Sequence, residues 1–202
     1  MSKEISRRTF IKGAAAAGVV VAAGSYFTWN GNNIPEKVKK GDVTYDVLII
    51  GSGGAGMRAA LAAAENKNLK VAVMTKLVPT RSASTMAQGG MNGVTGVTDT
   101  ADTVESHVFD TIKGGDYLCD QDAVEYFAER AGANIYEMDY MGYPYNRQKD
   151  GHFHQRKMGG HSHARASYFE DRAGHAMVHT LFEQCLDKGI DFISECQMLE
   201  IS

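Results

Sequence analysis

The sequence has few cysteines, and none is arranged to cross-link the chain or hold a metal. Its three cysteines, Cys119, Cys185 and Cys196, are odd in number and never form a C-x-x-C pair. This pattern predicts neither a disulfide framework nor a zinc or iron–sulfur site. We expect the three to be buried thiols.

Neither sign of charge predominates. Lys and Arg number 21 and Asp and Glu 24, which gives a formal net charge of −3, while 44% of the residues are hydrophobic and 22 are glycine. These values exclude a basic nucleic-acid-binding protein, a chain disordered by its charge and a collagen-like repeat. A chain of 202 residues is long enough to bury a sizeable core, and one domain is expected.

The first 30 residues predict an export signal. The stretch Gly13–Phe27 carries no charge, yet it is shorter than the roughly 20 residues that a spanning helix needs. Before it, Ser6–Lys12 reads Ser-Arg-Arg-Thr-Phe-Ile-Lys and resembles the twin-arginine motif, whose machinery exports folded proteins. We predict a twin-arginine signal peptide over 1–30, a linker over 31–41 and a domain over 42–202, in a periplasmic protein that acquires its cofactor before export.

A strand, a glycine turn, a helix and a second strand are predicted after the linker. The strand over Val43–Ile50 ends in the run Val-Leu-Ile-Ile, which is typical of a parallel strand buried on both faces. Residues 51–56 then read Gly-Ser-Gly-Gly-Ala-Gly, Met57–Asn66 favours a helix, and Leu69–Met74 favours a strand. The order is that of a βαβ unit.

The glycines of this turn suit a dinucleotide. Gly51 permits the tight turn, Gly53 lets the backbone approach a pyrophosphate, and Gly56 lets the helix lie close to the strand. The phosphates would meet the free N–H groups and the positive dipole end of the helix. An acidic residue that binds the adenosine ribose is usual about 20 residues further on, but Thr75 and Lys76 stand there. A dinucleotide is predicted, and NAD is disfavoured.

Residues 75–96 are polar and rich in glycine, with little periodicity, and by composition alone they would also suit a solvated surface loop. Their motifs, however, resemble the FAD-binding segments of succinate dehydrogenase and fumarate reductase flavoprotein subunits. The matching motifs are Thr75-Lys76, Pro79-Thr80-Arg81-Ser82 and Ala87-Gln88-Gly89-Gly90, and similar matches continue to Thr180. The twin-arginine leader is typical of the exported, periplasmic members of that family.

The resemblance implies an α/β fold with a Rossmann-like FAD-binding domain. By position, residues 51–56 would hold the FAD pyrophosphate, Thr75 and Lys76 the adenosine side, and residues 82–90 the isoalloxazine ring. The implied cofactor-binding residues are Gly51, Ser52, Gly53, Gly54, Ala55, Gly56, Thr75, Lys76, Thr80, Arg81, Ser82, Ala83, Ser84, Thr85, Met86, Ala87, Gln88, Gly89 and Gly90.

Family members move a hydride between flavin N5 and the central carbon of fumarate or succinate, while a distant arginine transfers the proton. The resemblance also implies two partners, an iron–sulfur subunit and a membrane-attached subunit that oxidises quinol. Gly89 and Met158 would lie near the substrate.

Two residues depart from the family pattern. Ala83 stands where the family usually has a histidine bonded to the 8α carbon of the flavin. We therefore expect non-covalent FAD and, since an 8α-nitrogen raises the flavin potential, a preference for fumarate reduction. Met158 replaces the phenylalanine of Gln-Arg-Pro-Phe-Gly-Gly, because residues 155–160 read Gln-Arg-Lys-Met-Gly-Gly. Methionine is apolar and adaptable, so it can still wall a dicarboxylate pocket.

The sequence stops at Ser202 on a predicted strand over Phe192–Ile201. The family's capping domain, its proton-transferring arginine and its main substrate-binding residues lie beyond this point. We therefore expect an N-terminal fragment with an incomplete FAD-binding domain, no catalytic residue of its own and no turnover alone.

Two other functions remain open. As a truncated chain, the protein would persist as an inactive FAD-binding or subunit-docking module. An enzyme similar to L-aspartate oxidase fits the flavin motifs but not the leader.

Histidines form two H-x-H pairs, His152 with His154 and His161 with His163. Imidazole clusters bind zinc or copper, but no carboxylate or cysteine lies at ligand spacing, so no metal site is predicted. His175 and His179 lie four residues apart on an expected helix that begins near Arg172, and we expect them to pack against neighbouring residues.

Two further helices are expected, over Thr103–Ile112 and Asp120–Ala131, the second with Asp120 as its N-cap. The aromatic and apolar residues of this region should be core rather than a platform for bases, and nothing basic accompanies them, so no nucleic-acid partner is predicted. These residues are Tyr126, Phe127, Ile135 and Tyr136.

Overall fold

The computed structural model describes residues 44–200, so the predicted signal peptide and linker lie outside the described residues. Two compact units make up the described chain. The first comprises residues 44–82 and 185–200, and the second comprises residues 83–184. No helix among residues 44–200 has the length and apolar content needed to cross a membrane.

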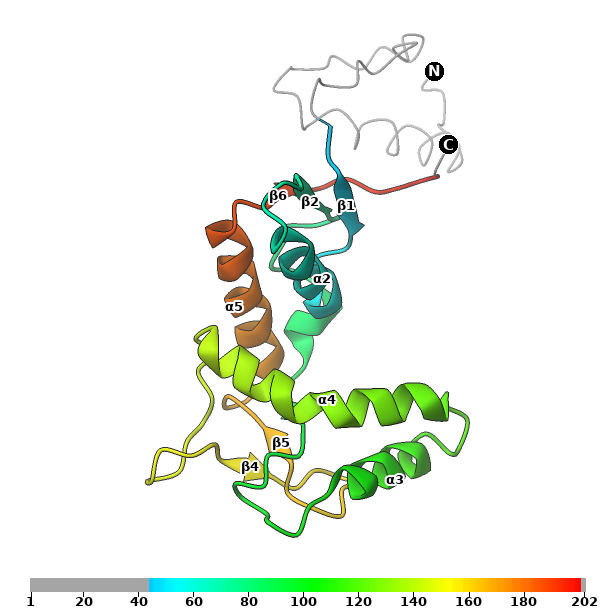
Figure 1. Cartoon of the computed structure of the whole chain (residues 1–202), viewed down its shortest axis with the longest axis vertical. Coiled ribbons are helices and arrows are strands. Elements are labelled where there is room, and N and C mark those ends of the chain that lie inside the picture. The colour runs from blue at the N-terminus through cyan, green and yellow to red at the C-terminus, as the bar shows by residue number, and fades with distance from the viewer. Residues whose placement is uncertain (1–43, 201–202) are drawn as a thin grey trace, which may run out of the picture. The chain divides into compact units, whose positions relative to one another are not determined.

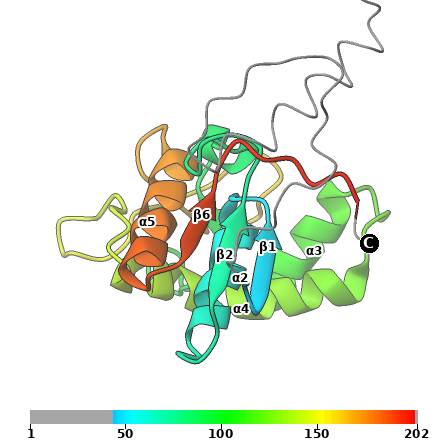
Figure 2. The same ribbon diagram turned by 90° about the horizontal axis from the view of Figure 1, so that it is seen from above.

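The first unit contains a parallel three-stranded sheet in the order β1-β2-β6 (Figure 2). Its strands are β1 (Val47–Ile50), β2 (Val71–Met74) and β6 (Asp191–Ile193). Helix α2 (Gly54–Ala64) connects β1 to β2, and its residues Met57 and Ala60 are fully buried. The predicted βαβ unit is therefore present, with the helix starting at the glycine turn itself.

Strand β1 is only half-buried, which corrects the prediction of a strand buried on both faces. Leu48 and Ile50 are 45% and 48% exposed. The physical reason is position: β1 is the edge strand of the described sheet, whereas the central strand β2 buries Val71, Ala72 and Val73.

The last strand is shorter than predicted. Strand β6 ends at Ile193, and residues 194–200 form no strand. Glu195 has φ +56°, a left-handed conformation that interrupts extended backbone. The prediction of a strand over Phe192–Ile201 is therefore wrong beyond Ile193.

The second unit combines three helices with a small antiparallel sheet. The helices are α3 (Val104–Gly114), α4 (Gln121–Tyr140) and α5 (Ala173–Asp187), which runs on into the first unit. The strands β3 (Met91–Asn92), β4 (Gln155–Arg156) and β5 (Ala166–Ser167) pair in the order β3-β5-β4. Strands of two residues carry no detectable periodicity, so this sheet was not predicted.

Helices α3 and α4 lie side by side (Figure 1). Thr103 caps α3 by accepting a hydrogen bond from the Ser106 N–H, and Asp120 caps α4 from the Ala123 N–H, as predicted. Helix α4 continues past the predicted end at Ala131. Gly132 lies within this helix and permits a close approach, since a Cβ there would lie 2.3 Å from the Val94 carbonyl oxygen.

Two predictions about burial need correction. Of the four residues expected in the core near α4, only Ile135 is buried, while Tyr126, Phe127 and Tyr136 are about half exposed because they project from other faces of the helix. Among the cysteines only Cys185 is buried, while Cys119 and Cys196 are half-buried. Both lie in connecting segments outside the helices and strands, so they do not enter either core.

Candidate functional site

The glycine turn after β1 is built around one close backbone contact. Gly51 has φ +107° and donates its N–H to the Met74 carbonyl at 2.7 Å. A Cβ on Gly56 would lie 1.9 Å from the Gly51 carbonyl oxygen and 3.5 Å from Cγ2 of Ile49. Only glycine fits at residue 56, so α2 starts tightly against β1.

The N-terminus of α2 suits an anion. Gly53 is its N-cap, no side chain makes a capping hydrogen bond there, and no acidic residue lies in the first turn. No carboxylate in the first turn of α2 therefore neutralises the positive end of its dipole.

Thr75 lies next to this turn, at the carboxyl end of β2. The buried Ser52 hydroxyl donates to Oγ1 of Thr75 at 3.1 Å. The backbone of Thr75 also bonds to β6 and beyond, through its N–H to Ile193 and its carbonyl from Cys196. Lys76 follows and is exposed. Ligands of open α/β sheets bind at the carboxyl ends of the strands, so the structure brings Gly51, Ser52 and Thr75 together where one would bind.

Three further predicted residues of this unit lie closer to the surface. Arg81 is exposed and Thr80 and Ser82 are half-buried, while the Arg81 N–H closes a turn to the Val78 carbonyl.

The second unit holds the predicted residues 83–90. A short 3₁₀ helix, η2 (Ala83–Met86), begins this segment. The start of α5 packs directly on it: Gly174 donates its N–H to the Ala87 carbonyl at 2.7 Å, and a Cβ on Gly174 would lie 2.0 Å from the Ser84 carbonyl oxygen. Gly174 thus positions the turn. A glycine at the start of a helix is common, so its place in the sequence does not reveal this role.

Residues 88–90 lie against β4 and β5. Gly90 has φ +120°, and a Cβ there would lie 2.5 Å from the Ser167 carbonyl oxygen. A Cβ on Gly89 would lie 3.3 Å from Cε of Met158. The two residues predicted to lie near substrate, Gly89 and Met158, are therefore neighbours, although 69 positions (158 − 89) separate them in the sequence.

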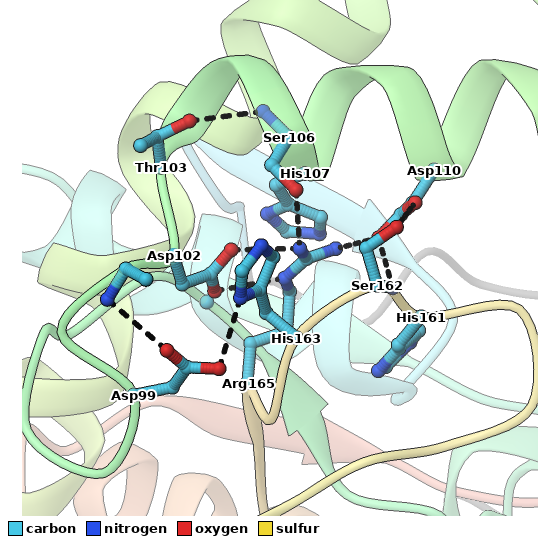
Figure 3. A network of polar contacts seen from close by, with 12 residues as sticks. Asp99, Asp102, Thr103, Ser106, His107, Asp110, His161, Ser162, His163 and Arg165 are labelled. Atoms are coloured by element: carbon cyan, nitrogen blue, oxygen red, sulfur yellow. Dashed lines mark hydrogen bonds and ion pairs between the residues drawn. The ribbon is translucent and has the colours of Figure 1, made fainter.

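A buried ion network in the same unit escaped the sequence analysis (Figure 3). Arg165 is fully buried and forms a bidentate pair with Asp102, Nε to Oδ2 at 2.9 Å and Nη2 to Oδ1 at 2.7 Å. Its Nη1 also donates to Asp110 at 2.7 Å. Asp110 accepts from the N–H and hydroxyl of Ser162 at 2.6 and 2.7 Å. The network therefore connects the start of α3 to the loop that follows Met158.

Opposing effects act on the pKa values of this network. Burial alone would raise the pKa of Asp110, but the hydrogen bonds from Ser162 and the charge of Arg165 lower it to about 2. Burial and then the charge of Arg165 lower the pKa values of His107 and His161. Asp110 is thus held as a carboxylate, while the two imidazoles favour their neutral form.

The histidines of the H-x-H pairs have separate partners. His154 Nδ1 lies 2.7 Å from the Tyr168 hydroxyl, and His163 Nδ1 lies 2.9 Å from Asp99 Oδ2. His175 and His179 pack against each other along α5, with tilted rings whose centroids lie 4.2 Å apart. Within residues 44–200, no three histidine, cysteine or acidic side chains converge as a metal site would require.

Comparison with known proteins gives two family matches. Residues 46–202 match the FAD-binding domain family, and residues 4–24 match the signal sequence of the twin-arginine translocation pathway.

Individual relatives are flavoprotein subunits of fumarate reductase and succinate dehydrogenase. The chain is 42% identical over 205 aligned positions to the 8-methylmenaquinol:fumarate reductase flavoprotein subunit of Wolinella succinogenes, covering 100% of this chain and 33% of that protein. It is 44% identical over 158 positions to the succinate dehydrogenase flavoprotein subunit of Coxiella burnetii, covering 75% of this chain and 27% of that one. The solved structure of E. coli quinol fumarate reductase superposes with a TM-score of 0.70 at 39% identity, over 75% of this chain and 26% of that one. The chain thus spans about a third of these relatives or less.

Proposed function

Since this chain belongs to the FAD-binding family of fumarate reductase and succinate dehydrogenase flavoproteins, we propose that it forms the FAD-binding part of a subunit that reduces fumarate. The observation that carries the proposal is the close approach of Gly56 to Gly51 at a helix N-terminus that has no side-chain cap. This geometry accepts a pyrophosphate and excludes any larger residue at position 56.

The residues of the first unit fit the nucleotide half of FAD. Gly51–Gly56 would bind the pyrophosphate through their backbone and the α2 dipole. Thr75 and Lys76 would contact the adenosine side, with Thr75 held in place by the Ser52 hydroxyl. Thr80 and Arg81 would extend this contact. An exposed lysine and arginine here suit the negative charge of a diphosphate.

Residues 82–90 would contact the isoalloxazine ring. FAD, when bound, supplies the hydride chemistry. The chain's own part is to orient the ring, exclude water from it and place Gly89 and Met158 beside the dicarboxylate. The Met158 thioether is apolar and flexible, so it can line the pocket without needing a hydrogen-bond partner.

Ala83 supports a non-covalent cofactor and fumarate reduction as the favoured direction. Alanine has no nucleophilic atom to bond to the flavin. Without an electron-withdrawing 8α-nitrogen, the flavin potential should stay low, which favours electron donation to fumarate over electron withdrawal from succinate.

We assign two partners and a compartment to the complete subunit. Its electrons would come through an iron–sulfur subunit from a membrane-attached subunit that oxidises quinol. The twin-arginine match over residues 4–24 supports export to the periplasm. We assign the signal peptide to residues 1–30, the linker to 31–41 and the FAD-binding domain to 42–202.

The direction of the reaction is tested with the complete subunit assembled with its partners. Fumarate-dependent oxidation of a reduced dye is measured against succinate-dependent reduction of an oxidised dye, at matched substrate concentrations. We expect the first rate to exceed the second about tenfold or more, which corresponds to at least ~1.4 kcal/mol. Equal rates, or faster succinate oxidation, would overturn the assigned direction while leaving FAD binding intact.

A further inference from the structure

Arg156 holds the two carbonyl groups that precede Gly89 and Gly90. Its Nη2 donates to the Gln88 carbonyl oxygen at 3.2 Å and to the Gly89 carbonyl oxygen at 2.9 Å. One nitrogen therefore draws two successive carbonyls to the same side of the backbone. The residue lies on β4, 67 positions (156 − 89) from Gly89 in the sequence, so this is a tertiary contact.

The two amide N–H groups then point the other way. In a planar trans peptide the carbonyl and the following N–H are antiparallel. A carbonyl of Gln88 turned toward Arg156 directs the Gly89 N–H away from it, and the Gly89 carbonyl does the same for the Gly90 N–H. Neither N–H donates to an acceptor within residues 44–200. Successive amides that point in one direction form a concave donor pair for an electron-rich atom.

Further contacts hold the Arg156 guanidinium in place beside the Gln88 and Gly89 carbonyls. It stacks over the Tyr168 ring, with Cζ 4.0 Å from the ring centroid, and the Tyr168 hydroxyl bonds to His154. Its Nε is buried without a partner in the described residues, so the carbonyl bonds and the ring stack are what fix it. The neighbouring Gln155 is fixed more strongly still, because its side-chain amide donates to the Gly93 and Arg165 carbonyls at 3.0 Å each.

We propose that Arg156 is a positioning residue that directs the Gly89 and Gly90 N–H groups at the electron-rich edge of the flavin ring. The inference rests on the proposed function, which places residues 82–90 around that ring. Two donors stabilise the reduced, more electron-rich flavin more than the oxidised form. Arg156 therefore raises the flavin potential without touching the flavin.

The test compares the midpoint potential of bound FAD in the full-length protein with that in Arg156→Met. We expect the ratio of reduced to oxidised flavin at a fixed potential to fall about tenfold, which is ~30 mV for a two-electron couple. Arg156→Lys retains one cation that reaches one carbonyl, so its shift should be smaller and of the same sign.

Arg147 provides a matched control. It also stacks on an aromatic ring, Phe153, with Cζ 5.3 Å from the centroid, and donates to a backbone carbonyl, that of Gly151, at 2.9 Å. Arg147→Met should lower the thermal unfolding midpoint comparably and leave the flavin potential unchanged.

The outcomes are distinguishable. An unchanged potential in Arg156→Met, with FAD still bound, overturns the role of Arg156 and leaves the proposed function standing. An equal shift in Arg147→Met overturns it as well, because the effect would then be a general loosening of the unit. If Arg156→Met does not fold, the Arg156→Lys variant decides: a lowered flavin midpoint potential supports the role of Arg156, and an unchanged or raised potential overturns it. Absence of FAD from the unsubstituted protein would instead reject the proposed function.

Discussion

Arg165 and Asp102 form a bidentate ion pair in which the guanidinium is fully buried, with N–O distances of 2.9 and 2.7 Å. The two residues lie 63 positions apart in the sequence. Because Arg165 also bonds to Asp110 and Ser106, one side chain joins the start of α3 to the segment carrying Met158. Arg165 is therefore one of the contacts that position that segment.

Arg165→Lys should destabilise the protein although the charge is kept. An ammonium group cannot match both oxygens of Asp102 and reach Asp110 in the same geometry. We expect a loss of about 3 kcal/mol in the free energy of unfolding, measured by denaturant unfolding. Arg147→Lys, at an exposed pair with Asp139, should cost less than about 1 kcal/mol. Equal losses of unfolding free energy in the two variants would show that the buried network stabilises the protein no more than an exposed ion pair does.

Acid should weaken the protein partly through Asp110. Its pKa is about 2 in the folded chain, against about 3.9 for an ordinary aspartate. A lowered folded pKa means that the stabilisation is complete above about pH 4 and is lost as the pH falls from about 4 through 2. The contribution is about 2 kcal/mol.

The variant Asp110→Asn isolates this contribution, because it cannot titrate. The free energy of unfolding should fall less steeply between about pH 4 and pH 2 in the variant than in the unsubstituted protein. Parallel pH profiles for the two proteins would contradict the assignment of the low pKa to this carboxylate.

Gly56→Ala should disrupt both folding and FAD binding. The added Cβ meets a backbone oxygen at 1.9 Å, and backbone cannot move aside as a flexible side chain can, so we expect a cost of about 3 kcal/mol or more. Gly114→Ala, at the end of α3, has nothing within 4 Å of its added Cβ. It should bind FAD as before. The measurement is FAD affinity alongside the unfolding midpoint, and unimpaired binding by Gly56→Ala would contradict the pyrophosphate assignment.

The sequence predicted the parts of the fold that rest on local pattern. Residues 47–74 carry an apolar run, a glycine turn and an alanine-rich helix in one continuous stretch, and the βαβ unit follows from them. The capping residue Asp120 was found for the same reason, since its signal lies within three positions of the bond it makes.

The parts that were missed depend on distant contacts. The β3-β5-β4 sheet joins two-residue strands from three separate segments. Arg165 is unremarkable in sequence and acquires its role only when Asp102 and Asp110 come within bonding distance. The predicted end of the second helix at Ala131 was too early, because the packing of Gly132 against Val94 is not visible from neighbouring residues.

Ala83→His tests whether FAD is bound without a covalent bond, because it restores the residue to which the family attaches the flavin. Ala83 is exposed, so a larger side chain can be accommodated without overlap in a core. We expect the unsubstituted subunit to release its flavin on acid precipitation. The histidine variant, whose imidazole stands at the family's attachment position, should retain flavin in the pellet. Yellow colour in the pellet of the unsubstituted protein would contradict a free cofactor.

Reconstitution of the purified full-length protein with FAD tests the central claim most directly. After removal of free flavin by gel filtration, the absorption spectrum of the protein fraction reports what remains bound. The glycine turn and the 82–90 segment predict an equimolar amount of FAD with a perturbed flavin spectrum. Protein that elutes correctly folded but without flavin absorbance would contradict the account.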